Sequence, residues 1–264
     1  MAASSLLGPQ AFLREISLKR DKIEDYDRFP FTLAAIKHLD RLEFSPEVTF
    51  IIGENGSGKA TIVEAIAVAL GFNAEGGTRN FAFETHSNHS ELHKYLRLVR
   101  SIRKPKDGFF LRAESFYNVA TNIEDLDKDD PEALISPPPV IDAYGGLSLH
   151  QQSHGESFLA LLLKRFFGNG LYILDEPEAA LSPQRQLAVL KRMHELVSKN
   201  SQFIIATHSP ILMAYPGARI YQITEGLFEE ISYEDTQHYQ ITKSFLDNPE
   251  RMISMMFKED ETLD

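Results

Sequence analysis

One glycine-rich segment constrains this chain more than any other feature. It has the sequence Gly53-Glu54-Asn55-Gly56-Ser57-Gly58-Lys59-Ala60-Thr61. The β-branched run Val48–Ile52 precedes it and predicts a buried parallel strand, and the apolar run Lys59–Leu70 predicts a helix. In this setting the loop N–H groups and the helix N-terminus face phosphate oxygens, and the lysine adds a positive charge. The segment therefore predicts a loop that binds the phosphates of a nucleoside triphosphate, rather than a chance glycine-rich turn.

The residue after the lysine departs from this motif. A hydroxyl residue normally stands there and binds Mg²⁺, but this chain has Ala60. The hydroxyl of Thr61 lies about 100° further round the helix, so we expect it to contact the α-phosphate. Triphosphate binding should survive, while Mg²⁺ loses one ligand. The alanine is either an engineered substitution or the mark of a naturally slow enzyme.

A second motif places two carboxylates at the end of a strand. It reads Leu171-Tyr172-Ile173-Leu174-Asp175-Glu176-Pro177. We expect Asp175 to lie beside the metal and Glu176 beside the attacking water. One acidic residue after a strand is common as a simple cap, but the whole string downstream of a phosphate loop favours the functional interpretation. Ser182 and Pro183 then predict the N-cap and first position of the next helix.

Two shorter motifs complete the set. The strand Phe203–Ala206 leads to His208, which we expect to contact the γ-phosphate and steady the water; a lone histidine would more often be structural. Ser153 and Gly155 precede an apolar helix that begins at Glu156, and with the N-terminus of that helix they form a second anion-binding site. By itself this last signal equally indicates a capping box.

The remaining pattern predicts an α/β fold, with a mainly parallel sheet flanked by helices. The expected strands are Phe12–Lys19, Leu42–Ile52, Tyr95–Ile102, Phe109–Ala113, Leu171–Leu174 and Phe203–Ala206. The expected helices are Lys59–Leu70, Glu156–Phe167 and Pro183–Lys199. Gly71–Glu91 is expected to be a loop, and Asn122–Pro139 a surface excursion.

Composition limits the class of partner. The net charge of −11 argues against a general nucleic-acid coat, which needs excess Lys and Arg. The net charge does not exclude a local basic patch, although a solvated strand edge is the simpler interpretation of the same residues. The basic residues concerned are Arg97, Arg100, Arg103, Lys104 and Lys106. The absence of Cys, of a signal peptide and of a long apolar segment predicts a cytoplasmic protein without membrane insertion.

The order of the four motifs resembles that of ABC-type ATPases, and the chain looks like the soluble branch of predicted AAA-family ATPases related to SMC-like and recombination-repair ATPases. The resemblance covers roughly Phe31–Ile223. It implies a P-loop NTPase head with an antiparallel β portion and a small helical region, which binds ATP with Mg²⁺. It further implies a homodimer, in which Ser153, Gly155 and Glu156 contact the γ-phosphate held by the second subunit. The family's Gln-bearing loop has no clear match, so Glu114 or Ser115 takes that place, with Glu114 as the candidate metal ligand.

The resemblance implies one ATPase domain over residues 1–264. Its expected parts are the N-terminal strands 1–47, the phosphate-loop lobe 48–115, the signature-bearing region 116–170, the Walker B and His-loop core 171–232 and the C-terminal helical segment 233–264. No heptads intervene between the phosphate loop and the signature, so this is not a chromosome-tethering rod.

Tyr26, Phe29 and Phe31 lie upstream of the phosphate loop and are candidates to stack on adenine. All three could equally be core residues.

Three functions follow as hypotheses. The first is an ATP-hydrolysing dimer that signals to an unidentified protein partner or to DNA, as in repair or phage defence. The second is the ATPase subunit of a membrane transporter. The third is a nucleotide-binding switch that hydrolyses little, which Ala60 makes credible.

Overall fold

The computed structural model describes residues 11–79, 90–114, 121 and 154–260. The strands are β1 (Leu13–Leu18), β2 (Arg41–Glu43), β3 (Val48–Gly53), β4 (Leu96–Arg100), β5 (Asp107–Arg112), β6 (Gly170–Asp175), β7 (Gln202–Ala206), β8 (Arg219–Thr224) and β9 (Leu227–Glu230). The α-helices are α1 (Ala34–Lys37), α2 (Lys59–Ala69), α4 (His154–Lys164), α5 (Pro183–Val197), α6 (Pro210–Met213), α7 (Gln237–Asp247) and α8 (Pro249–Asp260). Short 3₁₀ helices cover Arg20–Lys22, Glu91–Tyr95 and Tyr233–Asp235.

These strands form two sheets. The larger sheet has the order β5-β6-β7-β3-β8-β9, in which all neighbours are parallel except β8 and β9. The smaller sheet, β2-β1-β4, is antiparallel. The predicted α/β fold, with a mainly parallel sheet and an antiparallel portion, is confirmed.

The order of the larger sheet determines where chemistry can occur. Strands β6, β7 and β3 lie side by side and run in the same direction. Their carboxyl ends therefore meet at one edge, where open α/β sheets bind ligands. The three loops that follow these strands carry the motifs that the sequence singles out.

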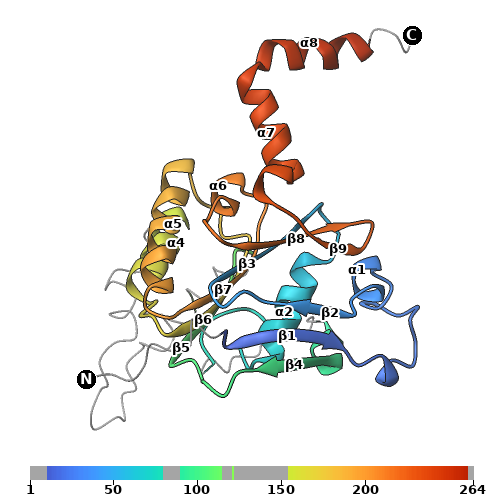
Figure 1. Ribbon diagram of the computed structural model, residues 1–264, viewed down its shortest axis with the longest axis vertical. Coiled ribbons are helices and arrows are strands. Elements are labelled where there is room, and N and C mark those ends of the chain that lie inside the picture. Colours follow the sequence, from blue (N-terminus) through green and yellow to red (C-terminus); the bar gives the residue numbers. More distant parts are fainter. Residues whose placement is uncertain (1–10, 80–89, 115–120, 122–153, 261–264) are drawn as a thin grey trace.

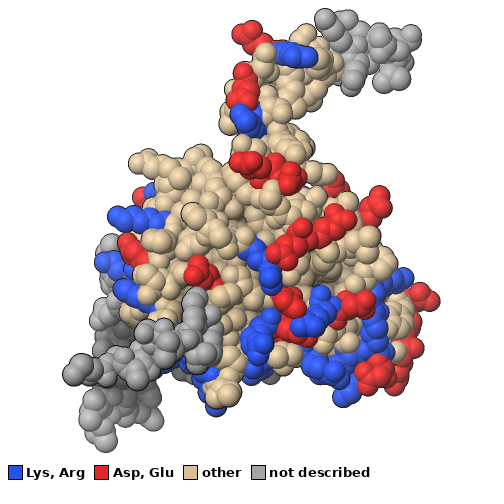
Figure 2. Space-filling view, in the orientation of Figure 1, with Lys and Arg blue, Asp and Glu red and all other residues tan. Residues whose placement is uncertain are grey.

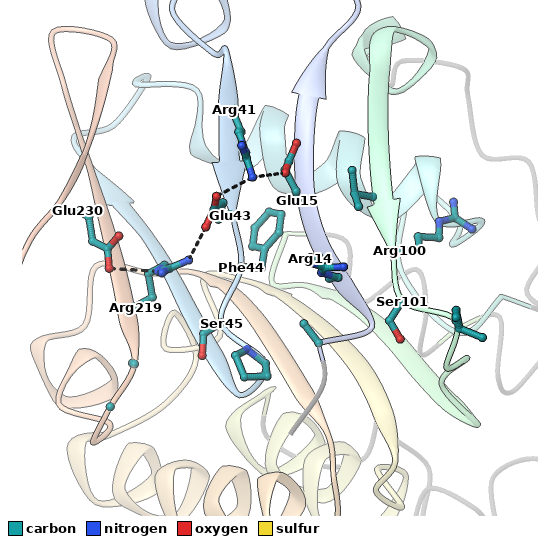
Figure 3. A pocket seen from close by; sticks show the side chains of 16 residues that line it. Arg14, Glu15, Arg41, Glu43, Phe44, Ser45, Arg100, Ser101, Arg219 and Glu230 are labelled. Atoms are coloured by element: carbon teal, nitrogen blue, oxygen red, sulfur yellow. Dashed lines mark hydrogen bonds and ion pairs between the residues drawn. The ribbon is translucent and has the colours of Figure 1, made fainter. Parts of the chain in front are cut away.

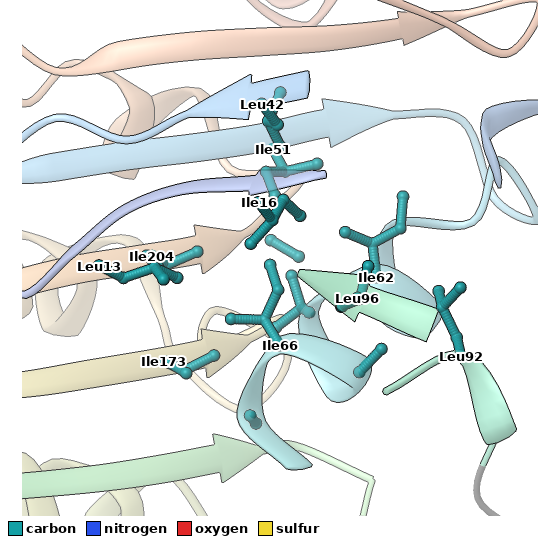
Figure 4. Close-up of a cluster of buried hydrophobic side chains, with 14 of the residues drawn as sticks. Leu13, Ile16, Leu42, Ile51, Ile62, Ile66, Leu92, Leu96, Ile173 and Ile204 are labelled. Atoms are coloured by element: carbon teal, nitrogen blue, oxygen red, sulfur yellow. The ribbon is translucent and has the colours of Figure 1, made fainter. Parts of the chain in front are cut away.

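Successive side chains of the central strands enter two separate cores, because strand residues alternate between the faces of a sheet. On β7, for example, Ile204 packs on one side, whereas Phe203 and Ile205 pack on the other. The first core lies between the two sheets and includes α2, whose Ile62 and Ile66 are fully buried (Figure 4). Helices α4, α5 and α6 cover the opposite face (Figure 1). Burial on both faces explains the continuous apolar runs in these strands.

One expected strand is wrong. Leu42–Ile52 is not a single strand: β2 ends at Glu43 in the antiparallel sheet, and β3 begins at Val48 in the parallel sheet. The chain turns between them, where the backbone N–H of Ser45 donates to Oγ1 of Thr49 over 2.8 Å. The break falls at Pro46, which lacks the N–H that a continuing strand needs. The expected surface excursion Asn122–Pro139 lies outside the described residues.

The C-terminal helical segment projects from the body (Figure 1). None of the residues of α7 is buried, and α8 leaves Met255, Met256 and Phe257 more than half exposed. Figure 2 shows that much of this projecting surface is uncharged. Among the described helices, none has the length and apolarity that crossing a bilayer requires.

A ladder of ion pairs joins the two sheets. Glu230 of β9 pairs with Arg219 of β8, Arg219 with Glu43 of β2, and Glu43 with Arg41, which also pairs with Glu15 of β1 (Figure 3). Charges of both signs are interspersed here (Figure 2). Strand β4, which carries Arg97 and Arg100, is an edge strand, as expected for the basic cluster.

Candidate functional site

The phosphate loop connects β3 to α2 and is shaped by its glycines. Gly56 and Gly58 have φ values of 79° and 99°, a region that side chains other than glycine rarely enter. Gly58 is the N-cap of α2, so the helix axis begins directly at the loop. The structure thus provides the strand, turn and helix start that phosphate binding requires.

Lys59 lies in the first turn of α2 with only 5% of its surface exposed. Its Nζ donates to the carbonyl oxygens of Gly53 and Glu54, each at 2.8 Å. Burial lowers the pKa of Lys59, while the charges of Glu176, Asp175 and Glu178 act to raise it. The lysine therefore places a positive charge inside the loop, close to three carboxylates.

Asp175 ends β6 and is almost completely buried. It stands opposite Arg112 in the register of β5 and β6, and its Oδ2 lies 3.7 Å from Nε of Arg112. Its Oδ1 is buried without a hydrogen-bond partner among the described residues. Burial raises the pKa of Asp175 to about 7, with Arg112 opposing this shift and Glu176, Glu114 and Glu64 adding to it.

Glu176 and His208 face each other across the ends of β6 and β7. The distance from Oε1 of Glu176 to Nε2 of His208 is 3.6 Å. Glu176 has a φ of 50°, a conformation that costs a non-glycine residue about 1–3 kcal/mol and is found preferentially at functional sites. Its backbone N–H donates to the carbonyl of Ala206 at 2.9 Å, which fixes the direction in which the side chain leaves the strand.

The loop that carries His208 is fixed by neighbours on both sides. Glu178 accepts the backbone N–H of His208 at 2.5 Å. Ser209 donates its hydroxyl to Gln186 of α5 at 2.5 Å, and its backbone N–H donates to Oγ1 of Thr207 at 3.0 Å. These hydrogen bonds hold the backbone of the loop on both sides of the His208 imidazole.

A hollow of about 550 Å³ lies against the phosphate loop. It is lined by Gly53–Ser57, by the end of β8 and its turn, and by Gln237 and His238 of α7. A larger hollow, of about 900 Å³, lies over the antiparallel sheet around the ion-pair ladder and includes no residue of the loop (Figure 3). The smaller hollow is the one that meets the motif residues.

The site fits a magnesium–nucleotide complex in part. The buried oxygens Oδ1 of Asp175 and Oγ of Ser57 lack hydrogen-bond partners among the described residues, so both can take a metal or phosphate contact. No group of three or more His, Asp or Glu side chains within the described ranges is arranged to hold a metal. Mg²⁺ usually binds through one or two carboxylates together with substrate phosphates, which matches Asp175. Ala60, in the first turn of α2, adds no side-chain ligand.

The other predicted residues lie around this centre. Glu114 is exposed and pairs with Arg112 at 3.2 Å, which links it indirectly to Asp175. Glu156 pairs with Arg185 of α5 at 3.1 Å. Ser153 and Ser115 lie outside the described residues.

The candidate adenine-stacking residues take different places. Phe31 is a core residue and packs edge-on against Tyr95. Tyr26 is half-buried beside Phe31, and Phe29 is exposed.

Sequence reasoning missed four residues that complete the site. Glu178 belongs to the same motif as Glu176, so its spacing could have suggested a role. Arg112, Gln186 and His238 carry no such signal, because only the strand order and the return of α7 bring them close.

Two family models match the chain. Residues 30–129 match the family described as "AAA domain", and residues 89–213 match the "AAA ATPase domain". These matches confirm the predicted resemblance to ATPases and support ATP binding. No curated protein sequence is significantly similar to this chain.

Solved structures with a similar chain arrangement include ABC and SMC heads. An ATP-binding cassette of an ABC transporter, in its ADP conformation, is 19% identical, with a TM-score of 0.47 over 91% of this chain and 96% of that one. The SMC head domain from Thermotoga maritima is 18% identical, with a TM-score of 0.42 over 83% and 98%. An SMC head bound to the C-winged helix domain of ScpA is 15% identical, with a TM-score of 0.46 over 84% and 98%.

Proposed function

We propose that this chain binds ATP and hydrolyses it to ADP and phosphate. One observation carries the proposal: the ends of β3, β6 and β7 bring Lys59, Asp175 and Glu176 together with His208 at one edge of the sheet. A cation for the phosphates, a metal ligand and a water-activating carboxylate are the parts that phosphoryl transfer requires.

Each side chain has a task that follows from its position. Lys59 exchanges its carbonyl contacts with Gly53 and Glu54 for phosphate oxygens of ATP. Glu176 orients the attacking water and takes its proton, while the water oxygen bonds to the γ-phosphorus and the bond to the bridging oxygen breaks. His208 donates toward the γ-phosphate and steadies this arrangement.

Mg²⁺, held by Asp175 and the ATP phosphates, would neutralise charge between the β- and γ-phosphates. Glu114 remains a second candidate ligand, as proposed from the sequence. Because Ala60 supplies no oxygen, we propose that hydrolysis is slow. A nucleotide-binding switch with little turnover is the second candidate function, and this alanine favours it.

The proposed output of the nucleotide cycle is a change in assembly, in which ATP binding closes a dimer and hydrolysis reopens it. We propose that two chains close around ATP, with Ser153, Gly155 and Glu156 of each facing the nucleotide of the other. This closure would signal to a protein partner or to DNA, in a process such as repair or phage defence.

Calorimetric titration with ATP tests the first step. We expect Lys59→Ala to weaken binding at least tenfold, because Lys59 is the one residue of the described part of the chain that places a cation inside the loop. Lys104→Ala, which removes an exposed lysine away from the loop, is the matched control and should bind as the natural chain does. Equal affinities of the Lys59→Ala and natural proteins would disprove the proposed site.

Phosphate release tests the second step. Glu176→Gln should keep ATP affinity and reduce turnover by about 10²–10⁴-fold, the contribution typical of a positioned general base. A natural chain that binds ATP but releases no phosphate would identify the nucleotide-binding switch instead.

A further inference from the structure

A second histidine lies directly behind His208. His238, in the first turn of α7, places its Nε2 3.2 Å from Nδ1 of His208, with the two rings 5.3 Å apart and inclined by 55°. The far nitrogen of His208, Nε2, faces Glu176. Glu176, His208 and His238 therefore form a line that starts at the proposed water site and ends in the C-terminal segment.

The fold holds His238 in this position. Thr236 is fully buried and caps α7, because its Oγ1 accepts the backbone N–H of Tyr239 at 3.2 Å. The ring of Tyr239 packs on Tyr233 with centroids 4.8 Å apart. Cap and ring contact fix the first turn of α7, although the rest of the helix is exposed.

Burial lowers the pKa of His208 and of His238, and the charge of Lys59 lowers both further, whereas Glu176 and Glu178 act to raise the pKa of His208. The net direction favours the neutral form of both imidazoles at neutral pH. A neutral imidazole carries one N–H and one acceptor nitrogen. The short contact between the rings therefore requires that one histidine donate and the other accept.

The surroundings decide the direction of this hydrogen bond. If His208 donated from Nδ1, the lone pair of its Nε2 would face the carboxylate of Glu176. The same arrangement would leave an N–H on Nδ1 of His238, which is buried without a partner among the described residues. Repulsion and a lost hydrogen bond both disfavour this choice. If His238 donates from Nε2, the N–H of His208 points at Oε1 of Glu176 across 3.6 Å, which is an electrostatic attraction longer than a hydrogen bond. The unpartnered Nδ1 of His238 then carries a lone pair instead of an N–H, so the N–H faces a carboxylate rather than no partner at all.

We propose that His238 is a positioning residue, which donates from Nε2 to Nδ1 of His208 and so holds His208 with its proton on Nε2. His208 can then donate, and not accept, at the edge where the proposed reaction occurs. The role in turnover depends on the ATPase function proposed above, whereas the tautomer does not.

Nitrogen-15 NMR of the imidazoles tests the tautomer without any nucleotide. We expect His208, assigned by the loss of its signals in His208→Ala, to carry its proton on Nε2. His238→Ala should shift it toward a mixture of tautomers. His238→Gln should preserve the tautomer, because the side-chain amide nitrogen of Gln can reach the position of Nε2. His194→Ala is the control, since His194 lies on α5 and contacts Tyr215 instead.

Turnover supplies the second measurement. Loss of a residue that orients a metal-ligating histidine typically costs about 10–100-fold. We expect a comparable cost for the residue that orients His208, so His238→Ala should lower kcat by about 10-fold or more and change KM less than twofold. His238→Gln should recover most of kcat, and thermal unfolding would show that each variant is folded. A proton on Nδ1 of His208 in the natural chain, or an unchanged tautomer in His238→Ala, would overturn the proposal. Absence of hydrolysis in the natural chain would disprove only the ATPase function.

Discussion

At the residue scale, the site concentrates charge that is poorly solvated. Asp175 is buried at the end of β6, and Arg112 compensates it from a distance of 3.7 Å. The neighbouring carboxylates of Glu176 and Glu114 add repulsion. A buried carboxylate in this setting lowers stability until a cation arrives, which is the expected condition of a metal ligand.

Replacing Asp175 by Asn should therefore stabilise the metal-free protein above neutral pH. The folded chain keeps the Asp175 proton up to a pKa of about 7, whereas the unfolded chain releases it near the ordinary value of 3.8. Stability from this group is thus fully present below about pH 3.8 and is lost progressively as the pH rises from there to about 7. At about 1.4 kcal/mol per pKa unit, the full penalty is a few kcal/mol.

Urea unfolding at pH 5 and pH 8, without Mg²⁺ and nucleotide, measures this effect. Asp175→Asn should raise the free energy of unfolding at pH 8 clearly more than at pH 5. Asp21→Asn, at an exposed position, should change neither value. An Asp175→Asn protein that is less stable at pH 8 would mean that the ion pair with Arg112 outweighs the burial of charge.

Ala60 leads to a second prediction at this scale. Ala60→Ser should raise Mg²⁺-dependent turnover at least 10-fold, since even changes behind metal ligands alter activity by about 10–100-fold. Steady-state phosphate release at several Mg²⁺ concentrations is the measurement. Unchanged turnover would show that water or Thr61 already completes the coordination, and adding Thr61→Val would separate these two cases.

At the element scale, the close contact between the starts of α4 and α5 carries a prediction. A Cβ at Gly155 would overlap the carbonyl oxygen of Ala180 and lie 2.6 Å from Nη1 of Arg185. Helix propensity favours Gly155→Ala by about 1 kcal/mol, but forced repacking costs about 1–3 kcal/mol. We expect a net loss of up to about 2 kcal/mol in the free energy of unfolding.

Denaturant unfolding of Gly155→Ala checks this balance. Lys164→Ala, at the exposed end of the same helix, should change stability by less than about 0.5 kcal/mol. A stabilised Gly155→Ala protein would show that α4 can shift away from α5 without loss.

The elements also show what the sequence could and could not predict. The phosphate loop, Asp175, Glu176 and His208 follow strands whose apolar runs identify them, so the elements and the meeting of these residues at one edge of the sheet could be predicted, while their chemistry stays a prediction. The division between β2 and β3 was missed because Leu42 and Val48 look like parts of one apolar run. Arg112 and His238 were missed because their roles depend on β5 pairing with β6 and on α7 returning to His208, and no local pattern encodes either contact.

At the scale of the whole molecule, two sheets and a projecting segment surround the edge of the sheet that carries the candidate site. The ion-pair ladder from Glu230 to Glu15 spans the sheets, and its partly exposed pairs should each contribute at most about 1 kcal/mol. Burial of α2 between the sheets is the main connection. The phosphate loop at the start of α2 is thereby fixed to both sheets at once.

Assembly is the last property to predict at this scale. The start of α4 is tied to α5, since Gly155 lies against Ala180 and Glu156 pairs with Arg185. We propose that its anion-binding end faces the nucleotide of a second chain, and two-fold closure is the commonest arrangement of identical subunits. We therefore expect a monomer without nucleotide and a dimer when ATP is bound and hydrolysis is blocked by Glu176→Gln.

Light scattering on a sizing column, with and without ATP and Mg²⁺, measures this change in mass. Adding Ser153→Arg to Glu176→Gln should prevent dimer formation while ATP binding to the single chain persists, because the new side chain adds bulk and charge where the two chains would meet. Ser198→Arg adds the same side chain beyond the opposite end of α5 and should leave the dimer intact.

The same measurements should be repeated with Ala60→Ser added to each protein, because the serine hydroxyl restores the metal ligand that Ala60 lacks. A Glu176→Gln protein that stays monomeric with saturating ATP in both backgrounds would disprove the closed dimer, and a dimer that ignores both ATP and Ser153→Arg would place the interface on another surface.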